Sequence, residues 1–181
     1  MRVREQMEVI IDHYPYHESI NQKLLEELKF LHFTTEIYNG DGGKTAVKAD
    51  QTSNDVVTPT ISLIKEWIVN LMMVNRNFNS RIDDCWAARY DKGDYTVSHN
   101  HYTCIFAFVY FIKCPRGSSP LVFTTSRKKI KAEEGKVVIF PGYLYHQVPK
   151  NQCDGRIVLA CNLLYNRGKC CHLMPTVVIF L

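Results

Sequence analysis

The 181-residue sequence has no apolar run of the roughly 18 residues that a membrane-spanning helix requires. Its opening stretch, MRVREQMEVIIDHY, carries charges where a secretory signal would have its apolar core, so we expect no leader peptide. The sequence also has no internal repeat and no low-complexity tract. These absences argue against membrane, secreted and repeat proteins. We expect a single domain, residues 1–181, in the cytoplasm.

Neither sign of charge is in large excess, because 22 Lys and Arg residues stand against 18 Asp and Glu residues. The densest basic cluster, SRKKIK at Ser126–Lys131, is short enough to be an exposed loop or strand edge. This pattern does not favour nucleic-acid binding. Hydrophobic residues make up 46% of the chain, which is enough to bury a core without disulfides or structural metals.

The cysteines show no pairing pattern, since none of them stands in a CxxC motif. They are Cys85, Cys104, Cys114, Cys153, Cys161, Cys170 and Cys171. We expect reduced thiols in an intracellular compartment, with Cys104, Cys114 and Cys161 packed in the core. The adjacent pair Cys170–Cys171 precedes His172, and the three residues could bind a metal ion. No second ligand pair accompanies it, so we expect a tail with spare thiols.

Apolar spacing predicts two helices in the first part of the chain. His17–Phe33 repeats leucine and isoleucine at helical intervals, and Thr58–Met73 begins with a Thr-Pro cap signal and keeps an apolar face. Between them lies a Gly- and Asp-rich loop, Tyr38–Asp55, with a short strand predicted at Thr45–Lys48. We expect residues 1–80 to form a helical support and to rim the mouth of a site as a lid.

The pattern changes near Cys85, where short runs rich in Val, Ile, Phe and Tyr alternate with Gly, Pro, Asn and Asp. Such runs are typical of a mainly β fold, either a sandwich or a barrel. Cys104–Ile112, CIFAFVYFI, is apolar on both faces and predicts a central strand that is covered on both sides. We expect residues 81–166 to form the β core, with the helices on its outer face and 167–181 as a tail.

Two histidines share one face of a predicted strand in YTVSHNHYTC. His99 and His101 stand at i and i+2, about 7 Å apart from a strand rise of about 3.3 Å per residue. A third, His146, follows the turn in FPGYLYH, and Arg156 begins the next predicted strand ten residues later. Imidazole is the commonest metal ligand, so the sequence predicts a three-histidine metal site. Coincidental histidines in a structural module are the alternative.

These residues resemble the double-stranded β-helix, or jelly-roll, core of the oxygenases that depend on iron(II) and 2-oxoglutarate. The stretch Trp86–Tyr165 is similar to the prolyl-hydroxylase-like branch and its small bacterial and phage members. His99 matches that family's first metal ligand, and His146 within GKVVIFPGYLYHQV matches the distal ligand. Arg156 within GRIVLACN matches the residue that binds the far carboxylate of 2-oxoglutarate.

One position departs from this family pattern, because His101 stands where the family has Asp or Glu. The two-histidine, one-carboxylate face is diagnostic of non-haem oxygenase iron. Three neutral imidazoles leave the ion with its full double charge, although three-histidine iron supports oxygen chemistry in the cupin-like thiol dioxygenases. Asp91 or Asp94 is an alternative source of a carboxylate, but YDKGDY is typical of a hairpin turn.

The resemblance implies an enzyme that uses iron(II), 2-oxoglutarate and molecular oxygen to hydroxylate a peptidyl residue or a small molecule. It assigns His99, His101 and His146 to the metal, and Arg156 to 2-oxoglutarate. The Tyr110 hydroxyl is the nearest candidate to assist Arg156, with a core aromatic as the other interpretation.

Two further functions stay open on the sequence alone. One is a cupin-like dioxygenase that uses three histidines without 2-oxoglutarate, and the other is a metal-binding jelly roll without turnover. The apolar tail in HLMPTVVIFL is expected to pack on the domain or on a second copy, as a homodimer.

Overall fold

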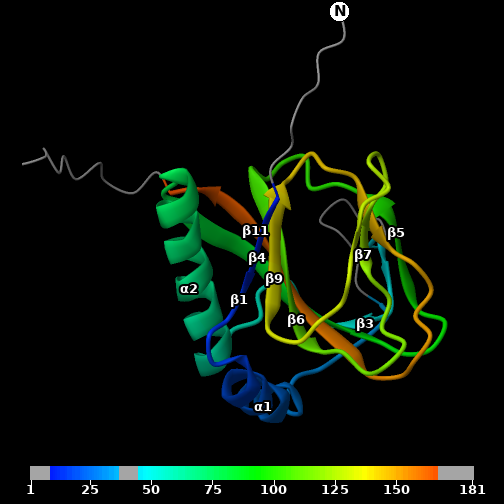
Figure 1. The fold of residues 1–181 in the computed structure, drawn as a ribbon. Helices are drawn as coiled ribbons and strands as arrows, with labels where there is room; N and C mark the ends of the chain where they lie inside the picture. The colour runs from blue at the N-terminus through cyan, green and yellow to red at the C-terminus, as the bar shows by residue number, and fades with distance from the viewer. Residues whose placement is uncertain (1–8, 37–44, 167–181) are drawn as a thin grey trace, which may run out of the picture.

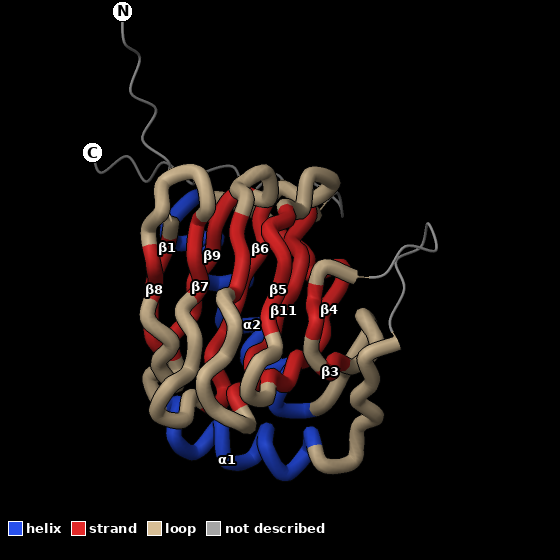
Figure 2. Tube along the Cα trace, turned by 90° about the vertical axis from the view of Figure 1, so that its right-hand side faces the viewer, coloured by secondary structure: helices blue, strands red, loops and turns tan. Residues whose placement is uncertain are grey.

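The computed structural model describes residues 9–36 and 45–166. The strands are β1 (Ile10–His13), β2 (Val47–Lys48), β3 (Asp50–Gln51), β4 (Ser80–Tyr90), β5 (Tyr95–His99), β6 (Phe106–Lys113), β7 (Leu121–Phe123), β8 (Lys129–Ile130), β9 (Lys136–Pro141), β10 (His146–Val148) and β11 (Arg156–Tyr165). They form a six-stranded sheet, β1-β9-β6-β11-β4-β3, and a five-stranded sheet, β2-β5-β10-β7-β8. All neighbouring strands are antiparallel, and the two sheets face each other (Figures 1 and 2). This is the predicted β sandwich.

Two helices cover the outer face of the six-stranded sheet, as predicted: α1 (His17–Leu28) and α2 (Pro59–Arg76) (Figure 1). Thr58 caps α2, because its hydroxyl oxygen accepts a hydrogen bond from the Ile61 N–H at 3.1 Å and Pro59 follows at the first helical position. Asn77 ends this helix in the left-handed conformation, with φ of 48°. Among the described residues, neither helix is both long and apolar enough to span a bilayer.

The first helix ends earlier than predicted, at Leu28 instead of Phe33. After Leu28 the chain forms a tight turn. The backbone N–H groups of Lys29, Phe30 and Leu31 each donate to the carbonyl of the residue three positions before. The apolar spacing continues past this point because Leu31 and Phe33 still pack on the core beneath the helices, although the chain there is no longer helical. The apolar spacing therefore predicts correctly that Leu31 and Phe33 pack against the core, but it does not predict where the helix ends.

Central strand β6 separates two apolar cores. Its residues Phe108, Tyr110 and Ile112 join the cluster under the helices. Ala107, Val109 and Phe111 join the cluster between the two sheets, and all six side chains are buried. Because successive side chains alternate in direction along a strand, a run that is apolar at every position fits only here, as the sequence predicts.

The N-terminal part contributes more than the helical support that we expected. Strand β1 pairs with β9 and β3 pairs with β4, while β2 extends the other sheet by pairing with β5. Strand β2 lies within the short strand predicted at Thr45–Lys48, whereas β1 and β3 were not predicted. The tail 167–181, including the Cys170–Cys171 pair, lies outside the described residues.

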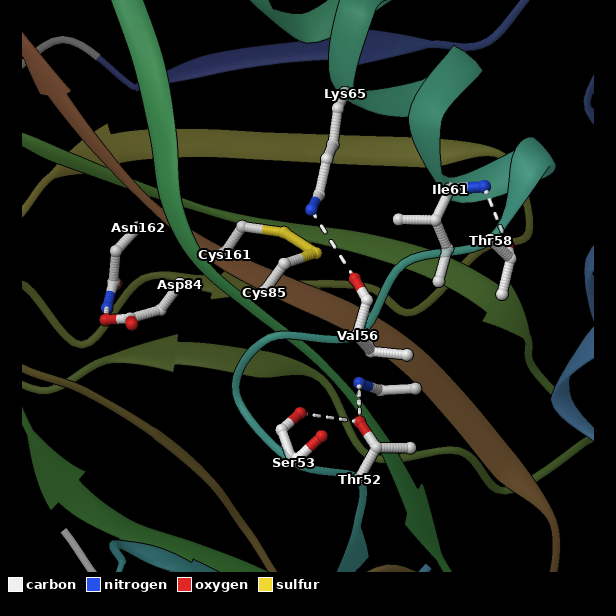
Figure 3. Close-up of a disulfide and its surroundings, with 11 residues drawn as sticks. Thr52, Ser53, Val56, Thr58, Ile61, Lys65, Asp84, Cys85, Cys161 and Asn162 are labelled. Atoms are coloured by element: carbon white, nitrogen blue, oxygen red, sulfur yellow. Dashed lines mark hydrogen bonds between the residues drawn. A yellow bond between two sulfur atoms is a disulfide. The ribbon is translucent and has the colours of Figure 1, made fainter. Parts of the chain in front are cut away.

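The structure corrects the prediction that the cysteines are all free. Cys85 on β4 and Cys161 on β11 are directly opposite in the strand register and form a disulfide (Figure 3). Both are fully buried in the core beneath the helices. The two positions are 76 residues apart in sequence, so their pairing depends on which strands become neighbours. Cys104, Cys114 and Cys153 remain free thiols.

Candidate metal centre

The chain just after β5 is fixed against the turn between β9 and β10. The His101 N–H donates to the Gly142 carbonyl at 2.7 Å, and the Gly142 N–H donates to the Ile105 carbonyl at 2.9 Å. A side chain at Gly142 would collide with the carbonyl oxygens of His101 and Cys104. The Pro-Gly sequence of this turn therefore sets the position of His101, which lies beyond the end of the strand.

His146 lies on β10 directly opposite His99 on β5, so the two imidazoles come from adjacent strands. Ring centroids are 4.3 Å apart for His99 and His146, 5.0 Å for His99 and His101, and 5.1 Å for His101 and His146. One ring nitrogen from each histidine lies within 4.8 Å of the other two. The sequence-predicted histidines are thus brought together, and one ion could contact all three.

Backbone carbonyls orient two of the three rings. Nδ1 of His99 lies 2.9 Å from the Val97 carbonyl oxygen, and Nδ1 of His146 lies 2.9 Å from the Leu144 carbonyl oxygen. A carbonyl can only accept, so Nδ1 carries the proton in both rings and Nε2 keeps its lone pair. Such second contacts fix the tautomer and direction of metal-binding histidines. Nε2 is the donor atom available to a metal in His99 and His146.

Burial keeps these imidazoles neutral. It lowers the pKa of His101 to about 3, with repulsion from the His146 and His99 rings as a further cause. Burial likewise lowers the pKa of His146 to about 4, and it lowers the pKa of His99. Neutral imidazole is the form that binds metal. Three neutral nitrogen donors suit a divalent transition metal such as iron, copper, nickel or zinc.

Arg156, the first residue of β11, is fully buried and faces the space between the sheets. Its guanidinium carbon lies 4.6 Å from the centroid of the Tyr90 ring and 5.5 Å from that of the Phe111 ring. None of its three side-chain nitrogens has a hydrogen-bond acceptor among the described residues. Burial lowers the pKa of Arg156, whereas the neighbouring Tyr90 raises it. A buried cation without a partner is costly, so this position suits an anionic ligand.

The histidines and Arg156 line one cavity between the sheets, which we call the Arg156 cavity. Val158 and Ala160, the next residues of β11 on the same face, line it too. Both side chains are small. Arg156, Val158 and Ala160 alternate along β11, so their side chains lie on the same face of the sheet.

Tyr110 does not reach this cavity, which corrects its predicted place beside Arg156. Its hydroxyl donates to the Asn21 side-chain oxygen at 2.7 Å, and Asn21 belongs to α1 on the opposite side of the sheet. The tyrosine beside Arg156 is Tyr90, directly opposite it on β4, and the Tyr90 and Thr96 hydroxyls lie 2.7 Å apart. Sequence reasoning missed Tyr90 because only strand pairing brings it to Arg156.

The structure supplies no carboxylate to the histidine cluster from the hairpin after β4. The Asp94 carboxylate accepts a hydrogen bond from the Asp91 N–H at 2.8 Å, and the Asp91 carboxylate accepts one from the Gly155 N–H at 2.8 Å. The Asp94 carboxylate is thus engaged within the turn, as YDKGDY indicated, and the Asp91 carboxylate is engaged by the backbone just before β11. Among the described residues, the metal-binding cluster contains imidazoles alone.

A second cavity shares part of its lining with the first. His99, His101 and Trp86 line both cavities, and the second is also lined by Asp84 on β4 and Asn162 on β11. We call it the Asp84 cavity. The candidate metal centre therefore borders one cavity with a buried cation and another with a carboxylate.

No protein-family model matches the sequence, and no curated protein matches it. Solved structures share its fold. The viral collagen prolyl hydroxylase vCPH from Paramecium bursaria chlorella virus 1, in complex with 2-oxoglutarate, is 15% identical with a TM-score of 0.67, covering 86% of this chain and 94% of that one. HygX from Streptomyces hygroscopicus, with nickel and 2-oxoglutarate bound, is 10% identical with a TM-score of 0.66, covering 89% and 84%. A Pseudomonas putida prolyl-4-hydroxylase is 10% identical with a TM-score of 0.64, covering 88% and 94%.

These similarities confirm the predicted jelly-roll fold with N-terminal helices. At such low identity they establish the fold alone, so the role of each residue depends on the geometry of this site.

The geometry predicts that the purified protein binds one iron(II) ion per chain. Replacing His99 or His146 by Ala removes one of three donors, and we expect stoichiometric binding to be lost in either variant. His32→Ala, which changes an exposed histidine outside the cluster, should bind like the wild type. Elemental analysis after anaerobic loading and desalting measures the metal content. Wild-type iron affinity in His99→Ala would contradict the assignment.

Proposed function

We propose that this protein is an oxygenase dependent on iron(II) and 2-oxoglutarate that hydroxylates a C–H bond. The observation that carries the proposal is the buried, unpartnered Arg156 guanidinium in the same cavity as the three histidines. A dicarboxylate could contact the metal with one end and Arg156 with the other. The shared fold with structures that contain 2-oxoglutarate supports this choice of anion.

In this proposal His99, His101 and His146 hold the metal, and their burial keeps them deprotonated without any neighbouring base. When bound, iron(II) and 2-oxoglutarate would supply the oxidising chemistry, in which one atom of molecular oxygen would end in the hydroxylated substrate and the other in succinate, with release of carbon dioxide. The chain itself supplies donor atoms, a cavity between the sheets and an orientation for the two reactants.

Arg156 would bind the far carboxylate of 2-oxoglutarate. A guanidinium stays charged and offers two parallel N–H donors to a carboxylate, which a lysine cannot do. The Tyr90 and Phe111 rings pack against the guanidinium carbon and hold it in place. Tyr90 and Thr96 place hydroxyl groups in the lining of the same cavity, where they can contact the carboxylate as well.

The three-histidine donor set favours a second candidate function, a cupin-like dioxygenase that does not use 2-oxoglutarate. With no anionic ligand from the protein, the metal keeps its full charge and a higher reduction potential than a site with one carboxylate. The bound dicarboxylate would itself bring negative charge to the metal in the first function. The unpaired Arg156 has no role in the second, so the structure supports the first more strongly.

We also propose a substrate class, a cellular location and an assembly for this protein. The substrate is a peptidyl residue or a small molecule that enters beside His99 and His101, and molecular oxygen is the other reactant. We place the protein in the cytoplasm, with a homodimer as its candidate assembly.

Arg156→Ala is expected to weaken 2-oxoglutarate binding by about 2–5 kcal/mol, the range for removing one partner of a buried charge pair. Arg156→Lys should lose less, because it keeps the charge without the planar fork. Anaerobic calorimetry on iron(II)-loaded protein measures the affinity, and succinate release in air measures the turnover.

Tyr110→Phe is the matched control for this experiment. It removes a buried hydroxyl that faces α1, so 2-oxoglutarate affinity should not change although stability falls. Metal content should stay near one ion per chain in all three variants. Unchanged affinity in Arg156→Ala, or no 2-oxoglutarate binding by the wild type, would favour the second function.

His101→Asp tests the unusual ligand directly. It exchanges a neutral donor for an anionic one and creates the two-histidine, one-carboxylate face, so we expect the variant to keep iron and to consume 2-oxoglutarate faster. His101→Ala should lose iron, because two donors remain. Iron content measures how well each variant retains the metal, and succinate production measures how fast it consumes 2-oxoglutarate. If His101→Ala keeps both at wild-type values, His101 is not a ligand.

A further inference from the structure

The Asp84 cavity is polar and lies against the metal-binding histidines. Asp84, Asn162, Asn54 and Gln51 line it together with His99 and His101. Its described lining contains one carboxylate and no lysine or arginine. The cavity therefore presents hydrogen-bond acceptors and the Asp84 carboxylate beside these histidines.

Asn162 has an unused acceptor that is buried in this lining. Its amide nitrogen donates to the Asp84 carboxylate at 3.0 Å (Figure 3). The opposite orientation of the amide would set its oxygen against the carboxylate, so the contact fixes which atom is which. The amide oxygen has no donor among the described residues, although the side chain is only 7% exposed. Leaving such an atom unpaired costs stability, which makes it a position prepared for a ligand donor.

The local fold explains how both side chains reach the cavity. Cys85 and Cys161, the neighbours of Asp84 and Asn162, point to the helix side of the sheet and are joined there, while Asp84 and Asn162 point to the other side (Figure 3). The register between β4 and β11 shifts between Cys161 and Leu163, so Asn162 sits at an irregularity. Bulges of this kind re-aim side chains near functional sites.

We propose that the Asp84 cavity binds a cationic, N–H-donating group of the substrate, such as a lysine or arginine side chain or another amine. An ammonium or guanidinium group can donate to the Asp84 carboxylate and to the Asn162 oxygen at once. Trp86 lines the same cavity, and an aromatic ring can contribute to binding a cation. The inference rests on the proposed oxygenase function and names the class of its substrate.

A neutral substrate group satisfies this cavity less well. A prolyl residue within a peptide has no N–H, so it would remove water from Asp84 and leave the Asn162 oxygen without a donor. An anionic substrate group would be repelled by the Asp84 carboxylate. Among peptidyl groups, the basic side chains are the ones that complement both acceptors.

The test uses protein loaded with zinc, which is diamagnetic and redox-inert, and saturated with 2-oxoglutarate, so that binding is measured without turnover. The probes are the N-acetyl, N-methylamide derivatives of lysine, arginine, norleucine and proline, titrated while the indole N–H resonance of Trp86 is followed by NMR. Lysine and norleucine differ in the ammonium group. We expect the lysine and arginine probes to bind at least about tenfold more tightly than the norleucine and proline probes, as for charge-assisted hydrogen bonds.

Asp84→Asn keeps the shape of the side chain and removes its charge, so the preference for the cationic probes should fall at least about tenfold. Asp83→Asn is the matched control, because Asp83 is exposed and pairs with Arg81 outside the cavity. Asp84→Glu keeps the charge and should keep the preference. Metal content and 2-oxoglutarate affinity, measured on each variant, should match the wild type.

Equal binding of the lysine and norleucine probes, or an undiminished preference in Asp84→Asn, would overturn the inference while normal 2-oxoglutarate binding leaves the oxygenase proposal intact. Loss of metal from Asp84→Asn would also overturn it, since Asp84 would then belong to the metal site. Absence of 2-oxoglutarate binding by the wild type would instead refute the proposed function on which the inference rests.

Discussion

The burial of the Arg156 guanidinium without an anionic partner is the constraint on which the functional account depends. The residue is fully enclosed, and aromatic rings cover its faces without accepting its hydrogen bonds. A domain of marginal stability does not readily support such a cost. A ligand carboxylate would satisfy the guanidinium, and the histidine cluster lines the same cavity. The anion site and the metal site are therefore best explained together.

In the proposed centre, the two cavities recognise ligand groups of opposite charge. The Arg156 cavity suits an anionic cosubstrate, and the Asp84 cavity suits a cationic substrate group, with His99 and His101 lining both. The six-stranded sheet holds both ends, because Arg156 and Asn162 lie on β11 while Tyr90 and Asp84 lie on the paired strand β4. The Cys85–Cys161 disulfide joins these two strands close to the Asp84 end.

Much of the site was predictable because its signals are local. His99 follows from the predicted strand, whereas His101 lies beyond the end of that strand and is held by the Pro-Gly turn. The same turn and the start of β11 locate His146 and Arg156. Tyr110 shows where such reasoning fails. A strand apolar on both faces does not reveal which alternate residues point inward, and the hydrogen bond to Asn21 depends on where α1 packs. Tyr90, Asp84, Asn162 and the disulfide all depend on the pairing of β4 with β11, which no local pattern specifies.

The most direct test of the central claim is a crystal structure of the iron- or nickel-loaded protein with 2-oxoglutarate, with anomalous diffraction to identify the ion. The account predicts one ion about 2.0–2.3 Å from a ring nitrogen of His99, His101 and His146, typical of imidazole ligands. It also predicts the keto acid of 2-oxoglutarate on that ion and the far carboxylate against Arg156. An ion elsewhere, or an Arg156 cavity without the dicarboxylate at saturating concentration, would contradict it.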